Sequence, residues 1–288
     1  GLGANPDLRG TDAFFGAISN NLGQLVQVAA NGTWTNEIDV AAYEATANPD
    51  GGELDSNPYA IERVDGGYLV ADAGANALLH VADDGTITTV AVFPNRMVEF
   101  PPGSGDMMPM QAVPTSVDVG PDGAYYVGQL TGFPFPVDGA NIYRVIPGEE
   151  PEVYAEGFTN IVDIAFAEDG TLYVVEITSN SLLSGDPHGS LIRVAEDGSQ
   201  TAIADDLFMP GGVAIGDDGY LLVLPHTELE GALVVAERIL LAIRSTAVGA
   251  PGVTASVGVS ATEGSDTLFF DTLLAQAEHA RDRASTQG

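Results

Sequence analysis

The feature that most constrains the fold is a hairpin pattern that recurs four times along the chain. Each copy is a short apolar run, a turn ending in Asp-Gly, and a second apolar run; the copies are Tyr59–Asp72, Ser116–Gln129, Val162–Glu176 and Gly212–Val223. Asp-Gly accepts the positive φ of a tight turn, so each copy predicts a β-hairpin. The turn glycines, which are Gly66, Gly123, Gly170 and Gly219, are spaced by 57, 47 and 49 residues.

A second predicted hairpin follows each of the first three copies, over Ala77–Phe93, Asn141–Ala155 and Ser190–Ala204. The leading segment Gln24–Val40 has the pattern of the second half of an earlier unit. Four strands in a unit of about 45–50 residues are typical of propeller blades. The sequence therefore predicts a mainly β fold, an incomplete β-propeller with three full blades plus partial ones. An open arc of this kind leaves apolar blade faces bare.

The repeat stops after Gly219, and the pattern that follows is helical. Thr227 and Glu230 have the spacing of a capping box, and apolar residues recur at helical spacing as far as Ile243. A strand over Val253–Ser260 and a helix over Asp271–Ala284 are predicted next. We therefore expect two parts, a partial propeller over residues 1–219 and a small α/β tail over residues 220–288.

The charge balance excludes some partners. Nine basic residues, all of them arginine, stand against 41 acidic ones, which gives a net charge of −32. Such a chain repels nucleic acid and anionic lipid. A salt-rich environment and a general acidic bias in the host both explain the composition. The chain has no cysteine, which excludes disulfides and thiolate sites, and no uncharged apolar run of about 18 residues that predicts a membrane span.

Several stretches closely resemble the ScyD/ScyE family. They are Asn48–Tyr59, Ala71–Asn76, Gln111–Ser116, Leu130–Pro136, Gly157–Asn160 and Leu182–Pro187. The resemblance covers about residues 1–219. It implies an NHL-like propeller of about six blades and a secreted or extracytoplasmic location, with an export signal that this chain does not show. It supplies no catalytic residues that could be transferred to this chain.

The tail resembles the C-terminal half of a GGDEF diguanylate cyclase domain over Leu221–Ile239 and Val253–Val259. The signature of that domain falls on Gly216–Tyr220, where Gly219 replaces its second acidic residue. The first half of the domain, with its metal-binding carboxylate, has no counterpart. Since phosphoryl chemistry needs Mg²⁺ held by carboxylates, we predict no cyclase activity. A decayed fusion and a join between two unrelated sequences both explain this seam.

The predicted site lies beside the central channel, on the face where loops before the innermost strands and after the second strands open. Polar groups there predict binding of a polar ligand, with Asp72 and Glu176 as ligands of Ca²⁺ or Mg²⁺. The alternative is that these groups cap strand ends and hold channel water. The polar candidates are Asp72, Gln129 and Glu176 after the second strands, and Asn57, Thr115 and Asn160 before the innermost strands.

Three loops carry further candidates. Phe133 and Phe135 form either a rigid wall for an apolar or aromatic ligand or a loop packed on its own blade. The oxygen-rich loop from Asp50 to Asn57 is either a Ca²⁺ site or a set of solvated turn residues. The methionine-rich loop Pro94–Val113 is predicted to plug the channel.

These features favour a secreted propeller that binds a small molecule or a protein at its channel face, with no predicted catalysis. One alternative is a metal-dependent propeller enzyme of the lactonase or lyase type, which would need several carboxylates around one ion. The other is an inactive GGDEF signalling fusion.

Overall fold

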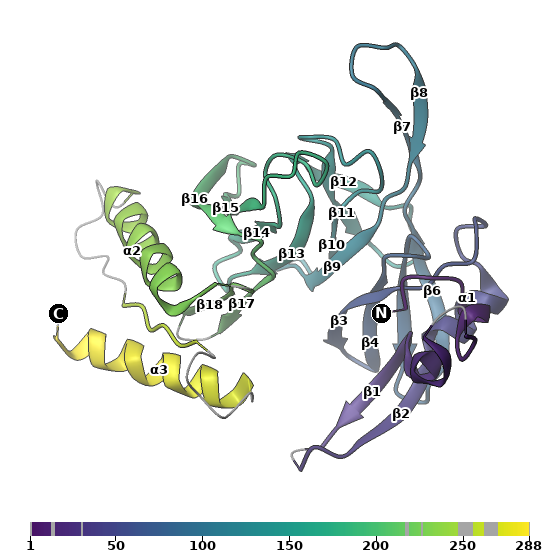
Figure 1. The fold of residues 1–288 in the computed structure, drawn as a ribbon, viewed down its shortest axis with the longest axis horizontal. Coiled ribbons are helices and arrows are strands. Elements are labelled where there is room, and N and C mark those ends of the chain that lie inside the picture. Colours follow the sequence, from purple (N-terminus) through teal and green to yellow (C-terminus); the bar gives the residue numbers. More distant parts are fainter. Residues whose placement is uncertain are drawn as a thin grey trace.

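The computed structural model describes residues 2–12, 15–29, 31–216, 219–225, 227–246, 256–261 and 270–287. Antiparallel sheets follow one another around an open arc, and two helices lie at its C-terminal end (Figure 1). Short 3₁₀ helices η1 (Pro6–Leu8) and η2 (Gly16–Asn21) precede the first strand. No helix among the described residues is long and apolar enough to cross a membrane.

Three sheets have four strands each, and their strands follow chain order across the sheet, as the repeat predicts. The tight turns at Gly66, Gly123 and Gly170 have φ values of 81°, 77° and 83°, which favour glycine. The strands are β3 (Pro58–Val64), β4 (Gly67–Asp72), β5 (Ala77–Ala82) and β6 (Ile87–Val92) in blade one; β9 (Pro114–Val119), β10 (Tyr125–Gln129), β11 (Ala140–Val145) and β12 (Glu152–Phe158) in blade two; and β13 (Ile161–Phe166), β14 (Leu172–Glu176), β15 (His188–Val194) and β16 (Gln200–Phe208) in blade three.

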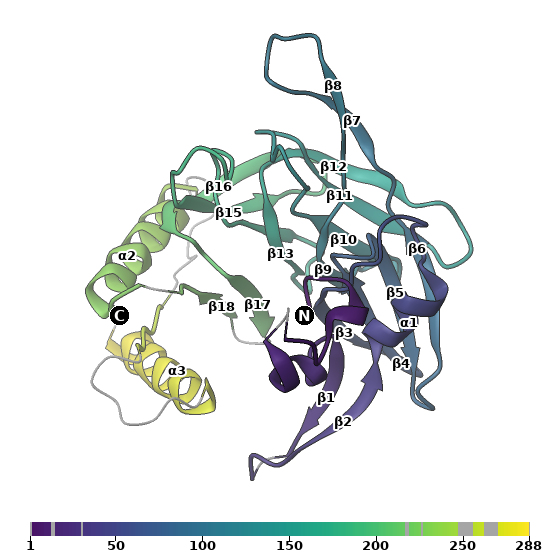
Figure 2. The ribbon, with the colours of Figure 1, turned by 45° about the vertical axis from the view of Figure 1, so that its right-hand side comes forward.

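Two-stranded sheets flank the blades: β1 (Gln24–Val28) pairs with β2 (Trp34–Asp39), and β17 (Gly212–Gly216) pairs with β18 (Gly219–Val223). Strands β3, β9, β13 and β17 contact one another in series, so the first strand of each sheet is the innermost (Figure 2). The protein is therefore an incomplete propeller of three full blades and two partial ones. The predicted division at residue 219 falls at the start of β18 and stays a prediction.

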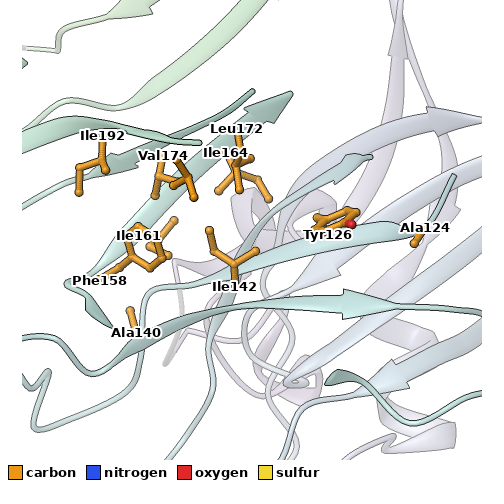
Figure 3. Close-up of a cluster of buried hydrophobic side chains, with 11 residues drawn as sticks. Ala124, Tyr126, Ala140, Ile142, Phe158, Ile161, Ile164, Leu172, Val174 and Ile192 are labelled. Atoms are coloured by element: carbon orange, nitrogen blue, oxygen red, sulfur yellow. The ribbon is translucent and has the colours of Figure 1, made fainter. Parts of the chain in front are cut away.

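The core is a series of apolar layers between neighbouring blades. Tyr126 contributes to the layer between blades two and three (Figure 3). Its neighbour Val127 contributes to the layer between blades one and two. Successive side chains of a strand point to opposite faces of the sheet, so a strand buried on both faces is apolar throughout. Each blade is therefore stabilised mainly by apolar contact with the blades that precede and follow it in the chain.

Two elements were not expected from the sequence. Helix α1 (Val40–Ala47) follows β2, and its N-terminus is capped by Asp39, whose Oδ1 accepts a hydrogen bond from the Ala42 backbone N–H at 2.9 Å. Val40 is fully buried against blade one. The β segment predicted over Gln24–Val40 therefore ends at Asp39, where the capping carboxylate favours a helix start.

The second unexpected element is a hairpin of β7 (Arg96–Glu99) and β8 (Met107–Met110) within the methionine-rich loop. It projects away from the blades in both views (Figures 1 and 2). Met97 and Met107 are 58% and 55% exposed, whereas Met110 is buried. The predicted channel plug is therefore wrong, because pairing of β7 with β8 carries these side chains outward.

The tail contains helices α2 (Leu229–Thr246) and α3 (Phe270–Gln287), close to the predicted spans. The Thr227 hydroxyl donates to the Pro225 carbonyl at 3.2 Å, and the capping box at the start of α2 stays a prediction. Residues 256–260, the described part of the predicted strand Val253–Ser260, have no regular secondary structure. Residues 217, 218 and 226, which belong to the degenerate signature and the segment after it, lie outside the described residues.

Helix α2 packs on the outer strand of blade three. Val235 of α2 is buried in one apolar layer with Leu207 of β16 and Val213 of β17. At the edge of this layer the Arg238 guanidinium donates to the Asp205 carbonyl at 3.2 Å and lies 3.3 Å from an Asp206 carboxylate oxygen. The helix therefore covers part of the apolar face of blade three.

Candidate functional site

The three equivalent positions at the ends of the second strands are buried and perform the same task. Asp72, Gln129 and Glu176 are 0%, 1% and 5% exposed. Each accepts a hydrogen bond from a backbone N–H in the same sheet or in the loop leading into it: from Asn57 at 2.6 Å, from Asn141 at 3.0 Å and from Thr159 at 2.7 Å, respectively. The repeat thus places one polar side chain per blade against an amide that has no ladder partner there.

The two carboxylates accept further hydrogen bonds. Asp72 accepts from the Gly74 and Ala75 amides, both at 3.1 Å, and from the Ser56 hydroxyl at 2.8 Å. Glu176 accepts from the hydroxyls of Ser179 at 2.8 Å and Ser190 at 2.9 Å. Burial raises the pKa of both carboxyls above the ordinary values, and these hydrogen bonds offset part of that rise.

These contacts do not fit a metal ion held by Asp72 and Glu176. A ligand oxygen must direct a free lone pair at the cation, and a carboxylate has about four of them. Asp72 already accepts four hydrogen bonds and Glu176 accepts three. Among the described residues, no group of three acidic or histidine side chains is arranged to hold an ion. The geometry favours strand-end capping, and metal binding at these two positions stays a prediction without support from the contacts.

Of the three residues predicted to precede the innermost strands, Thr115 lies within β9, and Thr115 and Asn160 connect neighbouring blades. The Thr115 hydroxyl in β9 donates to the Ile161 carbonyl in β13 at 2.7 Å. Asn160, buried and with a positive φ of 47°, donates to the Leu130 carbonyl at 2.8 Å and accepts from the Leu182 amide at 3.1 Å. Asn57 is half-buried, and its backbone carbonyl accepts from the Ala73 amide at 2.9 Å. All three positions therefore order the loops of this face.

Three acidic residues on the innermost strands were missed by the sequence reasoning, namely Glu62 in β3, Asp118 in β9 and Asp163 in β13. Asp118 in β9 accepts a hydrogen bond from the Phe166 amide in β13 at 2.6 Å. Asp163 in β13 accepts from the Val213 amide in β17 at 2.9 Å. Burial raises the pKa of Asp118, and it raises that of Asp163 to about 6. A single acid within an apolar inner strand was the available signal, and at Asp118 and Asp163 it marks an interblade hydrogen bond.

The two predicted aromatic residues lie at the surface beside a third ring. Phe133 is 46% exposed, and its ring contacts that of Phe100 edge to face at a centroid distance of 4.8 Å. Phe135 lies 6.3 Å from Phe133, also edge to face. We call Phe100, Phe133 and Phe135 the aromatic surface. It joins the loop after β10 to the hairpin of β7 and β8, and it offers apolar ring faces to solvent.

No protein-family model matches the chain, and no curated protein matches its sequence. Solved structures of similar fold include a catalytically inactive virginiamycin B lyase from Staphylococcus aureus with quinupristin, at 18% identity over 72% of this chain and 58% of that chain, with a TM-score of 0.46. A gluconolactonase from Xanthomonas campestris has 16% identity over 71% of this chain and 63% of that chain, with a TM-score of 0.47. The chain spans less than two thirds of either protein, and the likeness concerns the propeller-like fold alone.

Proposed function

We propose that this chain is a binding protein that holds an apolar or aromatic small molecule, or a partner with such a side chain, at the aromatic surface. The observation that carries the proposal is the exposed ring of Phe133, braced edge to face by Phe100 and Phe135. A fixed group of rings binds an apolar ligand with little loss of side-chain freedom. The polar groups of the same face are engaged within the protein, so they support the loops.

The proposal extends to family and location. The motifs of residues 48–59, 111–116 and 130–136 support membership of the ScyD/ScyE family, and with it an extracytoplasmic location. The absence of lysine and the net charge of −32 suit a protein in a salt-rich medium. No catalysis is part of this proposal.

A comparison of two phenylalanine variants tests the binding proposal. A panel of small aromatic compounds is screened against the protein by saturation-transfer NMR, and hits are titrated. Phe133→Ala should weaken binding about tenfold or more, the usual effect of losing an aromatic contact at the centre of a site. Phe208→Ala, which removes a comparably exposed ring from β16, should bind as the unaltered protein does. Equal binding by both variants would refute the assignment of the aromatic surface.

A metal-dependent lactonase-type enzyme is the second candidate, and one observation favours it. Glu62, Asp118 and Asp163 all lie on innermost strands; burial raises the pKa values of Glu62 and Asp163, and the charge of Asp118 raises both further. Acids with raised pKa values beside a channel are candidates for proton transfer. Lactone hydrolysis that requires Ca²⁺ or Mg²⁺ and is lost in Asp163→Asn would favour this candidate over the binding protein.

For the tail, we propose a structural role without nucleotide chemistry, on the basis of its degenerate GGDEF-like signature and the packing of α2. Val235 and its apolar neighbours cover a face of blade three that would otherwise meet solvent. GTP turnover in the presence of Mg²⁺ would contradict this proposal and would favour the signalling fusion.

A further inference from the structure

Four buried oxygen atoms without a hydrogen-bond partner lie where α1 meets the loop before blade one. They belong to Glu44 and Asn48 at the end of α1 and to Asp55 in the loop. Together with Asp50 of the same loop, these residues form what we call the Glu44 cluster. The helix lies beside blade one in Figure 2. The carboxylate of Asp72, which closes β4, is close enough to repel both Glu44 and Asp55. Three carboxylates and an amide thus gather around a fourth carboxylate.

Four side-chain oxygens of the Glu44 cluster, none of them from Asp50, are buried without partners. Glu44 is 1% exposed, and neither of its carboxylate oxygens has a hydrogen bond of normal geometry. Asn48 Oδ1 and Asp55 Oδ1 are also buried and unpartnered. A buried acceptor without a donor is unfavourable by about 1–3 kcal/mol, and a buried unpaired charge by more. Four such atoms in one place point to a bound species that supplies positive charge.

The surrounding contacts hold Asp50 and Asn48 in place. Asp50 accepts hydrogen bonds from the Gly52 amide at 2.7 Å and from Asn76 Nδ2 at 2.9 Å. The amino group of Asn48 donates to the Gly52 carbonyl at 3.0 Å, which leaves its oxygen as the free end of the amide. Glu44 and Asn48 are four residues apart at the end of one helix, so they share a face. These contacts fix Asp50 and Asn48, whereas no hydrogen bond of normal geometry holds the Glu44 carboxylate oxygens or Asp55 Oδ1.

No arginine neutralises the cluster through the ion pairs seen among the described residues. Arg9, the basic side chain near α1, pairs with Asp39 at 2.9 Å, at the opposite end of the helix. Burial, followed by the charges of Asp72 and Asp50, raises the pKa of Glu44 to about 7, and the Asp55 amide offsets a part of this rise. Burial and Asp72 likewise raise the pKa of Asp55.

We propose that Glu44, Asn48, Asp50 and Asp55 form a Ca²⁺ site that fastens helix α1 and the 48–57 loop to blade one. All the donors are oxygens, and Ca²⁺ accepts six to eight oxygen ligands in irregular geometry, whereas Mg²⁺ requires a near-ideal octahedron. No three acidic side chains of the described residues yet converge on one point. Binding therefore draws the Glu44 and Asp55 carboxylates together, and Asn48 Oδ1 adds a neutral ligand.

The site differs from the calcium loop considered from the sequence, which ran from Asp50 to Asn57. Glu53 of that loop is exposed, and Asn57 uses its backbone groups to bond with Asp72 and Ala73. Glu44 and Asn48 replace them, because α1, an element that the sequence did not predict, places both residues beside the loop.

Calcium titration of the chelator-treated protein tests the proposal, with calorimetry and thermal unfolding as readouts. Concentrated KCl is held constant, because Ca²⁺ would otherwise stabilise a chain of net charge −32 by screening alone. We expect one Ca²⁺ per chain and a higher melting temperature. Glu44→Gln and Asp55→Asn should each lower the Ca²⁺ affinity. Loss of a residue that only supports a ligand lowers metal affinity about 10- to 100-fold, and we expect at least this effect from the loss of a ligand itself. Glu168→Gln, the same change at an exposed turn of blade three, should bind normally.

Each contrary result would overturn the site. If the unaltered protein shows no heat of binding and no shift in melting temperature, there is no Ca²⁺ site. If Glu44→Gln and Glu168→Gln respond equally, the ion acts through general screening. If Mg²⁺ binds as tightly, the calcium assignment is wrong. If Glu44→Gln melts higher while Ca²⁺ has no effect, Glu44 is a protonated core residue.

Discussion

Replacing Glu176 tests whether the polar residue that closes the second strand of each blade serves the fold or a ligand. Glu176→Ala removes the acceptor of the Thr159 amide and of two serine hydroxyls. The hydroxyls can turn toward each other, because Ser179 Oγ and Ser190 Oγ are 3.1 Å apart, but the amide cannot. One lost hydrogen bond to a charged group is worth about 1.5–3 kcal/mol, and the cavity adds to this. We expect Glu176→Ala to lower the free energy of unfolding by about 3 kcal/mol.

Glu176→Gln is the matched control, since blade two already uses glutamine at this position. Gln129 Oε1 accepts a hydrogen bond from the Asn141 amide at 3.0 Å, and Gln129 Nε2 donates one to the Ala112 carbonyl at 3.1 Å. A glutamine at 176 keeps an acceptor for the Thr159 amide, while the serine hydroxyls can turn to accept from its amino group. The expected change is therefore within about 1 kcal/mol, the net worth of an ordinary hydrogen bond.

Urea unfolding at constant salt, followed by far-ultraviolet circular dichroism, measures both variants. Unfolding of Glu176→Ala at the same urea concentration as the unaltered protein would refute the capping role. So would an equal loss in Glu176→Gln, because the negative charge itself would then be required, as for a bound cation.

Three further predictions concern pH, the core and the tail. The pKa of Asp163 is about 6 in the folded protein and lower in the unfolded chain, so the stabilisation from its protonated form is present at low pH and is lost as pH rises through 6. Urea unfolding should therefore show a more stable protein at pH 5 than at pH 7.5. In Asp163→Asn this difference in the free energy of unfolding should be smaller by about 1 kcal/mol. Phe158→Ala, at a fully buried ring between blades two and three, should cost about 3–5 kcal/mol by the same assay, against less than about 0.5 for the exposed Met97→Ala. Val235→Asp should release α2 and speed tryptic cleavage at Arg238, whereas Val234→Asp, at an exposed neighbour, should not; equal cleavage in both would show that α2 does not cover blade three.

The site shows where sequence reasoning reached its limit. The repeat correctly aligned Asp72, Gln129 and Glu176, because equivalent places in a repeat follow from spacing alone. It did not reveal that each binds a backbone amide and is buried. The acceptor role of Asp118 depends on an amide 48 residues away, and no local pattern encodes that distance. The sequence predicted only part of the aromatic surface. Phe133 and Phe135 lie in one motif, whereas the β7–β8 hairpin brings Phe100 into contact with them.

By itself, the sequence determined the blades. A positive φ at Gly66, Gly123 and Gly170 and apolar runs on both sides of each turn are local properties, so four-stranded units follow from short stretches of chain. Only the tertiary structure decided what the polar residues do, because a hydrogen-bond partner depends on how distant segments pack. Helix α1 is the clearest case: it starts where Asp39 caps it, and packing on blade one buries Glu44 among other carboxylates. Only folding buries the oxygens of Glu44, Asn48 and Asp55 away from hydrogen-bond donors.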